Sequence, residues 1–169
     1  NFEIDVSGSD LFAKDYTVVV AETGNDKNML AHKFADRSKE IIRSRHGQNL
    51  YRYPNSKKGT TDLKIRLYCV AIYFLFKELQ KRFKFREATI DICRDFPGNE
   101  ADIRQSLKHL LGAKLGLSVA MHFTKLPKES IADKYAFLIR HDSYNKLGKY
   151  CLEIKTEQFE EFLKPKKAR

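Results

Sequence analysis

Cysteine is scarce in this chain of 169 residues, which contains three of them. Cys69, Cys93 and Cys151 lie far apart, and none belongs to a Cys-x-x-Cys pair or to a Cys/His spacing. This pattern excludes a disulfide scaffold and a zinc ribbon. The simplest interpretation is a protein of a reducing compartment.

Long apolar runs are also lacking. The most apolar run, residues 67–76, is about half of the roughly 20 residues that a membrane-spanning helix needs. The N-terminus has neither the charged nor the apolar region of a signal peptide. We therefore expect a soluble, cytoplasmic protein that does not contact a membrane.

Several motifs of common enzyme classes are missing as well. The five histidines form no HxxxH or HExxH pattern, so zinc catalysis is not expected. Ser7-Gly8-Ser9 is not a nucleophile elbow, and Gly98, Gly112 and Gly116 do not form a phosphate-binding loop. No nucleotide-binding fingerprint is present.

Positive charge is what the chain has in excess. It contains 32 Lys and Arg against 22 Asp and Glu, a net charge of +10, which favours polyanions such as nucleic acid or anionic lipid. With 42% hydrophobic residues it can bury a core of its own. We expect one domain over residues 1–169, with a C-terminal extension at 141–169.

A basic, aromatic segment at residues 43–59 is interpreted as a long loop. Its Arg and Lys side chains can contact phosphates, and Tyr51 and Tyr53 can stack on bases. A solvated loop without a ligand is the alternative. The candidate nucleic-acid-binding residues are Arg43, Arg45, Tyr51, Arg52, Lys57 and Lys58.

Hydrophobic periodicity predicts an initial β-hairpin followed by alternating helices and strands. This order is typical of an α/β fold with a mixed β-sheet of about five strands and helices on both faces. The predicted strands are 2–7, 16–21, 87–96, 117–124 and 150–155, with 29–34 as a further strand or the start of a helix; the predicted helices are 60–79, capped by Thr60 or Thr61, 99–111, 130–140 and 157–163.

Five aspartates occupy positions where α/β sheets gather functional groups, namely strand ends and the N-termini of the following helices. Asp5 lies in the first strand, and Asp91 and Asp95 lie in a middle strand, with Asp95 at its carboxyl end. Asp62 opens the long central helix and Asp133 a late one. A carboxylate inside an apolar strand costs free energy unless it is paired or binds a metal.

Converging carboxylates would favour Mg²⁺ or Mn²⁺, which are hard cations that accept oxygen ligands. Two such ions suit phosphodiester hydrolysis, because one activates water and the other stabilises the leaving oxygen. Each acid alone also has a structural interpretation, as a turn acceptor, an ion-pair partner or a helix-dipole partner. Their common placement at element ends, in this order, is what points to catalysis.

The ordered combination resembles the ribonuclease H-like superfamily, also called the retroviral integrase fold. The residues that carry the likeness are Ile4-Asp5-Val6-Ser7-Gly8 before a hairpin, an acid that closes a middle strand, and Ser130-Ile131-Ala132-Asp133-Lys134-Tyr135-Ala136 at a late helix. The resemblance covers roughly residues 1 to 140 and is closest to uncharacterised nuclease-like families with an Asp-x-Ser-Gly strand.

This resemblance implies Asp5 as a ligand shared by two metal ions and Asp133 as the ligand on the late helix. Asp95 would be the middle ligand, with Asp91 as the competing assignment. Asp62 stands where some members place a glutamate. The implied activity is a Mg²⁺- or Mn²⁺-dependent nuclease, a hydrolase acting on DNA or RNA. The alternative is a non-catalytic nucleic-acid-binding module of a larger assembly on the same fold.

Overall fold

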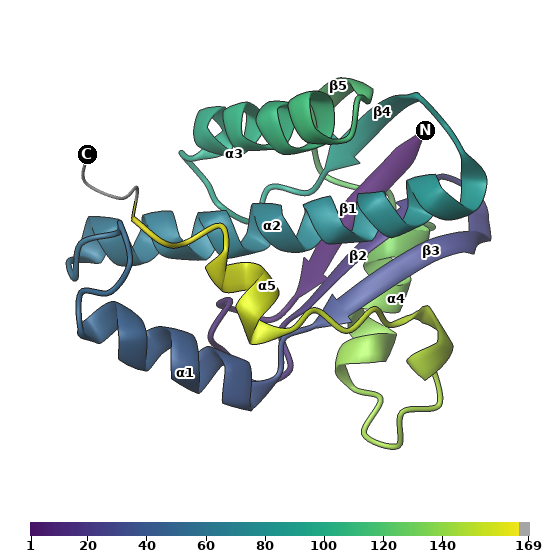
Figure 1. Cartoon of the computed structure of the whole chain (residues 1–169). Helices are drawn as coiled ribbons and strands as arrows, with labels where there is room; N and C mark the ends of the chain where they lie inside the picture. Colours follow the sequence, from purple (N-terminus) through teal and green to yellow (C-terminus); the bar gives the residue numbers. More distant parts are fainter. Residues whose placement is uncertain (166–169) are drawn as a thin grey trace.

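The computed structural model describes residues 1–165, which form a sheet covered by helices (Figure 1). In chain order the elements are β1 (Phe2–Ser7), β2 (Thr17–Glu22), β3 (Asn25–Lys33), α1 (Asp36–Gly47), α2 (Lys57–Phe83), β4 (Glu87–Ile92), α3 (Glu100–Leu107), the π-helical turn η1 (Lys108–Lys114), β5 (Ser118–Phe123), α4 (Ile131–Arg140), the 3-10 turn η2 (Gly148–Tyr150) and α5 (Thr156–Glu160).

The five strands form one mixed sheet in the order β3-β2-β1-β4-β5. The β1–β2 and β2–β3 pairs are antiparallel, whereas β4 runs parallel to both β1 and β5. The predicted α/β class with a five-stranded mixed sheet is confirmed. The layout is consistent with that of ribonuclease H-like domains.

Alternation of side chains along β1 assigns its residues to two faces of the sheet. Ile4 is fully buried in the main core, which α2 covers. Asp5 points to the other face, because it is opposite Val19, and Val19 packs against Ala132 and Ala136 of α4. Figure 1 shows α2 and α4 on opposite sides of the sheet. The two small alanines let α4 approach β1 and β2 closely.

The long helix α2 begins at Lys57, three residues before the predicted start. Ser56 is its N-cap, and the Ser56 hydroxyl accepts a hydrogen bond from the Gly59 N–H at 3.0 Å. Thr60 donates its own hydroxyl hydrogen back to the Ser56 carbonyl, so the prediction of a threonine cap is wrong. A Cβ at Gly59 would lie 1.9 Å from the Pro54 carbonyl oxygen, and only glycine permits that approach.

The predicted long loop at 43–59 is also wrong. Residues up to Gly47 belong to α1 and those from Lys57 to α2, which leaves residues 48–56 as the connection. The buried residues of α1 are Lys39, Ile42 and His46, and their spacing of three and four residues is that of one helix face.

The C-terminal part of the described chain packs against the rest of the domain. The predicted strand 150–155 is reduced to one bridge between Cys151 and Ala31. Phe159 of α5 is buried, and its ring centroid lies 5.4 Å from that of Phe34. The basic residues Lys166, Lys167 and Arg169 lie outside the described residues. No helix within residues 1–165 combines the length and apolarity needed to cross a membrane.

Candidate metal centre

Two aspartates and a cysteine converge where the parallel strands β1 and β4 end side by side. The Cys93 N–H donates to the Ile4 carbonyl at 3.0 Å, and the Asp95 N–H donates to the Cys93 carbonyl at 3.0 Å. These bonds place the residues after β4 beside Asp5. One ligand atom from each of Asp5, Cys93 and Asp95 lies within 4.8 Å of the others, so this group could hold a metal ion.

The Asp5 carboxyl is held in a setting that disfavours its charge. Burial is the largest cause and a hydrogen bond with the Asp133 side chain the second, and together they raise the pKa of Asp5 to about 6. The Val6 N–H, which donates to Asp5 at 2.8 Å, and the Cys93 thiol act in the opposite direction. Asp5 therefore contacts both Asp133 and Cys93.

Burial, followed by the negative charge of Asp5, raises the pKa of Asp95 to about 7. Its Oδ2 atom is buried and has no hydrogen-bond partner within residues 1–165. Burial together with the two carboxylates raises the pKa of the Cys93 thiol to about 12. A buried carboxylate oxygen without a donor, beside a second acid, is the environment that a bound cation would relieve.

The start of α4 places Asp133 beside Asp5. The Ser130 hydroxyl is the N-cap and accepts from the Asp133 N–H at 3.2 Å. The same hydroxyl donates its hydrogen to the Glu3 carboxylate, which is buried on the face of β1 that also carries Asp5. The Glu3–Ser130 contact thus fixes the start of α4 over β1, with Asp133 next to Asp5.

Glu3 was missed among the candidates from the sequence. The signal for it is the spacing of two acids, Glu3 and Asp5, two residues apart in a strand that is otherwise apolar, because that spacing puts both on one buried face. Cys93 belongs to no Cys-x-x-Cys or Cys/His spacing, so the sequence did not predict it as a ligand. The signal for it is its position two residues before Asp95, at the same strand end.

Two predicted acids lie outside the group. Asp91 is opposite Glu3 in β1 and His122 in β5, so it lies before the strand end at which Asp5, Cys93 and Asp95 converge. Asp62 is on α2, at the other face of the sheet, and pairs with Lys58 at 2.9 Å. Of the five aspartates from the sequence, the structure brings together Asp5 and Asp95, while Asp133 lies beside Asp5 and outside the group that includes Cys93.

The predicted nucleic-acid-binding residues are in different environments. Tyr51 is buried and its hydroxyl donates to Glu160 at 3.0 Å, so it cannot stack on a base. Arg45 pairs with the same carboxylate. The Arg43 guanidinium lies 5.3 Å from the Phe12 ring centroid, and Arg52 donates to the Tyr53 hydroxyl. Lys58 is exposed but paired with Asp62, and Lys57 is exposed.

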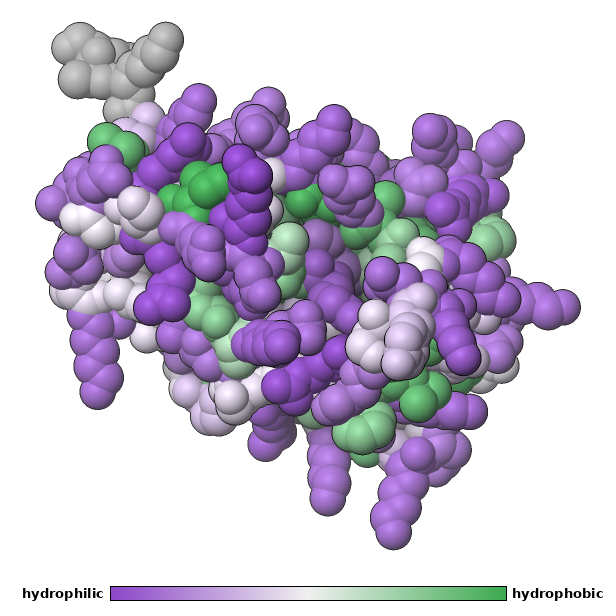
Figure 2. All heavy atoms as spheres, turned by 90° about the horizontal axis from the view of Figure 1, so that it is seen from below, coloured by the Kyte–Doolittle hydropathy of each residue, from purple (hydrophilic) through white to green (hydrophobic). Residues whose placement is uncertain are grey.

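The surface around these residues is mainly polar. Figure 2 views the molecule from the side of α1 and shows long hydrophilic side chains over most of that face, with apolar residues in small separate patches. Such a surface is compatible with a charged ligand.

Comparisons of the chain with protein-family models, with curated proteins and with solved structures find no match. A function must therefore be argued from the chemistry of the site.

Proposed function

We propose that the protein is a metal-dependent nuclease that hydrolyses phosphodiester bonds of DNA or RNA. Its site would hold Mg²⁺ or Mn²⁺, two ions in the full site, through Asp5, Asp95 and Asp133 in a ribonuclease H-like domain. The observation that carries the proposal is the convergence of Asp5 of β1 with Asp95, just after β4, with Asp133 of α4 beside Asp5 and the pKa of Asp5 and Asp95 raised.

The donor set fits a hard divalent cation. Carboxylate oxygens are the ligands that Mg²⁺ and Mn²⁺ prefer, and Asp95 Oδ2 is a buried oxygen with no donor among residues 1–165. Bound ions of this kind supply a nucleophilic water and Lewis-acid stabilisation of a phosphodiester. Asp5 contacts both the Cys93–Asp95 side and Asp133, so it would be the shared ligand.

Two further features support the proposal. The acids follow one another along the chain in the first strand, just after the middle strand β4 and in a late helix, which is the order that the sequence resemblance implies. The net charge of +10 favours a polyanionic substrate.

The decisive experiment compares cleavage by the wild type and Asp5→Asn on labelled single-stranded DNA, duplex DNA, RNA and an RNA–DNA hybrid, with Mg²⁺ or Mn²⁺. Loss of a group that acts in the reaction should lower the rate by at least roughly a hundredfold. Asp91→Asn is the matched control, because Asp91 lies in the adjacent strand and outside the group. Equal activity of wild type and Asp5→Asn would refute the proposal.

A non-catalytic nucleic-acid-binding module is the second candidate. The observation that favours it is the Cys93 thiol, which is not a hard ligand and whose pKa is raised to about 12. This alternative expects no Mn²⁺ binding and no cleavage, together with nucleic-acid binding that weakens steeply with salt.

A further inference from the structure

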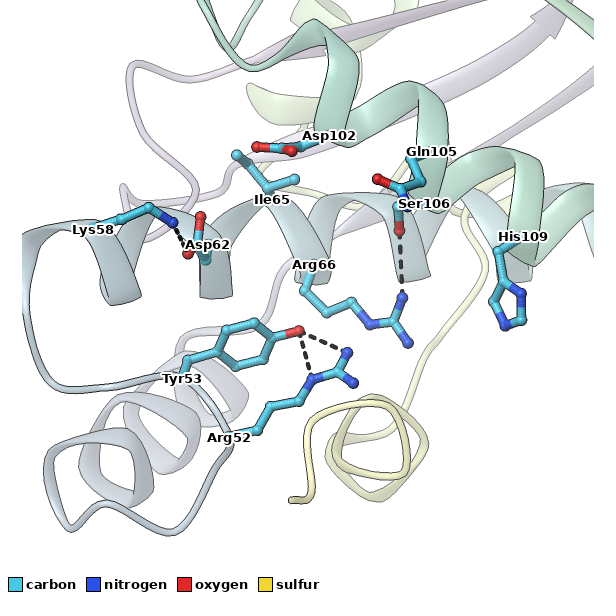
Figure 3. A pocket seen from close by; sticks show the side chains of 10 residues that line it. All are labelled: Arg52, Tyr53, Lys58, Asp62, Ile65, Arg66, Asp102, Gln105, Ser106 and His109. Carbon is cyan, nitrogen blue, oxygen red and sulfur yellow. Dashed lines mark hydrogen bonds and ion pairs between the residues drawn. The ribbon is translucent and has the colours of Figure 1, made fainter. Parts of the chain in front are cut away.

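A hollow of about 430 Å³ lies between the first half of α2, the α3–η1 helix and residues 52–53 (Figure 3). It is separate from the carboxylate group, because it lies on the α2 side of the sheet whereas Asp5 faces α4. Nothing in the proposed nuclease chemistry uses it.

Charge is divided unevenly along this hollow. At one end Lys58 pairs with Asp62 at 2.9 Å, and the negative charge of Asp102 adds to the effect that raises the pKa of Lys58. Figure 3 shows these three side chains together at that end. With two carboxylates and one ammonium group, this end of the hollow has an excess of negative charge.

The other end, here called the cationic end, consists of Arg52, Arg66, Ser106 and His109. Figure 3 shows the Arg52 and Arg66 guanidinium groups on one side of the hollow, below Ser106. Neither arginine forms a salt bridge to a carboxylate anywhere in residues 1–165. Two guanidinium groups near each other with no acid between them repel unless an anion is bound.

Both guanidinium groups are fixed in position by neutral partners. Arg66 donates from Nη1 to the Ser106 hydroxyl and from Nε to the Phe162 carbonyl, both at 3.3 Å. Arg52 donates from Nε and Nη2 to the Tyr53 hydroxyl at 3.1 and 2.9 Å. Among the described residues, the remaining donors of each group have no acceptor. An ordered guanidinium loses little side-chain entropy when it binds.

Of the two arginines, Arg66 has the more buried charge and gains more from a bound anion. Burial is the largest cause that lowers its pKa, and the charge of Arg52 acts in the same direction. A half-buried cation with a second cation nearby is stabilised by a tetrahedral anion, whose oxygens accept from two guanidinium groups at once. His109 adds a polar ring from the π-helical turn η1, a type of turn often found at functional sites.

We propose that the cationic end of this hollow binds a phosphate group, either that of a free phosphate monoester or one in the backbone of a nucleic-acid strand. The phosphate oxygens would accept from Arg52 and Arg66, with Ser106 and His109 beside them. The phosphate site stands on these contacts alone and does not depend on the nuclease proposal.

One contact places the hollow relative to the segment that follows β4. Arg66 precedes Tyr68 on α2, and the Tyr68 ring lies 5.0 Å from that of Phe96, the residue after Asp95. The hollow therefore lies along the part of α2 that packs against the end of β4.

The experiment is calorimetric titration of orthophosphate, of a nucleoside monophosphate and of a short single-stranded oligonucleotide, all in EDTA. Arg66→Gln should weaken binding roughly tenfold, because a charge-assisted pair of hydrogen bonds is lost. Arg52→Gln, at an exposed residue, should weaken it several-fold and tests the site without risk to the core. Arg82→Gln is the matched control, since Arg82 is on α2 but pairs with Glu78.

Asp62→Asn should change the phosphate affinity in the opposite direction. It releases Lys58 from its ion pair, so phosphate should bind a few-fold more tightly. Weaker binding in Arg66→Gln and Arg52→Gln, with Arg82→Gln unchanged, would support the site. Equal binding by all variants, or no binding of orthophosphate to the wild type at millimolar concentration, would overturn it.

The three ligands identify the source of the phosphate. If Arg66→Gln weakens oligonucleotide binding together with orthophosphate, the site takes a strand phosphate. If the oligonucleotide is unaffected while the two small ligands bind less tightly, it takes a free monoester. EDTA removes divalent ions, so a failure of the nuclease proposal would leave all of these results unchanged.

Discussion

The Ser130 hydroxyl donates a hydrogen bond to the buried Glu3 carboxylate and so joins the start of α4 to β1. The same hydroxyl accepts from the Asp133 N–H, which makes it the helix cap as well. Because Glu3 and Asp5 share one face of β1, this contact holds Asp133 where it reaches Asp5. Helix capping and site geometry therefore depend on one oxygen atom.

Replacing this serine should affect both properties. Ser130→Ala removes the cap and leaves the Glu3 carboxylate buried without its donor, so the free energy of unfolding should fall by about 2–3 kcal/mol. Mn²⁺ affinity, followed by titration calorimetry, should fall as well because Asp133 loses its fixed position. Ser143→Ala, at an exposed serine, is the control. Unchanged urea denaturation of Ser130→Ala would show that the contact contributes nothing.

Asp95 should make the metal-free protein less stable as the pH rises. Its pKa is raised to about 7 from an ordinary value of 3.8, so between these values the native state binds more protons than the unfolded state. Native stability therefore falls as the pH rises through this window. Asp95→Asn cannot ionise and should be more stable than the wild type at pH 8 by up to about 4 kcal/mol, because the pKa rises from 3.8 to about 7 and one pKa unit corresponds to about 1.4 kcal/mol.

The difference between Asp95→Asn and the wild type should vanish below about pH 4, where the unfolded carboxyl is also protonated. Thermal unfolding at pH 4, 6 and 8 in EDTA measures it. Adding Mn²⁺ at pH 8 should raise the melting temperature of the wild type much more than that of the variant. A pH-independent difference would show that Asp95 is not held against its charge.

His32 should act on stability in the opposite direction. Burial lowers its pKa to about 4 from 6.5, although a bond between Nδ1 and the Leu152 carbonyl at 2.9 Å partly offsets this. Between pH 6.5 and 4 the unfolded chain binds the extra proton, so stability is complete above this window and is lost as the pH falls through it. The total loss should be about 3 kcal/mol.

His32→Asn keeps a donor for the Leu152 carbonyl and has no charge to gain. Its urea midpoint should change less between pH 7 and pH 4.5 than that of the wild type, whereas His141→Asn, at an exposed histidine, should follow the wild type. If the urea midpoint changes equally with pH in all three proteins, His32 is not the source of the acid sensitivity.

Tyr51 should contribute to stability and not to nucleic-acid binding. Tyr51→Phe removes the hydroxyl that donates to Glu160 at 3.0 Å and should lower the free energy of unfolding by about 1 kcal/mol. Oligonucleotide affinity, measured by fluorescence anisotropy, should be unchanged. Arg52→Ala should weaken that binding with little effect on stability. A large loss of affinity in Tyr51→Phe would show that the Tyr51 hydroxyl contributes to nucleic-acid binding.

Local patterns predicted the parts of the fold that local physics determines. The alternation in residues 2–7 and the apolar run at 16–21 predicted the first hairpin, because a strand with one buried face repeats every second residue. The start of α2 was not predictable in the same way. Ser56, Thr60 and Thr61 are all acceptable caps, and the close contact of Gly59 with Pro54 favours Ser56.

The site shows the same limit. Alternation puts Asp91 and Asp95 on one face of the same segment, so the sequence leaves both open as partners of Asp5. The pairing of Ile4 with Ile92 distinguishes them, and that register is a tertiary property. Tyr51 and Glu160 lie 109 residues apart. No local sequence signal shows that a tyrosine in a basic segment is buried by a hydrogen bond to so distant a residue.

The parallel pairing of β1 with β4 also has a kinetic consequence. Residues 2–4 pair with residues 90–92, so Asp5 and Asp95 come together after most of the chain has been ordered. Contacts between residues so distant in sequence form slowly and late in folding. A cation that binds them should therefore slow unfolding and leave the folding rate nearly unchanged. The stabilisation by the cation would therefore appear as a longer lifetime of the native state.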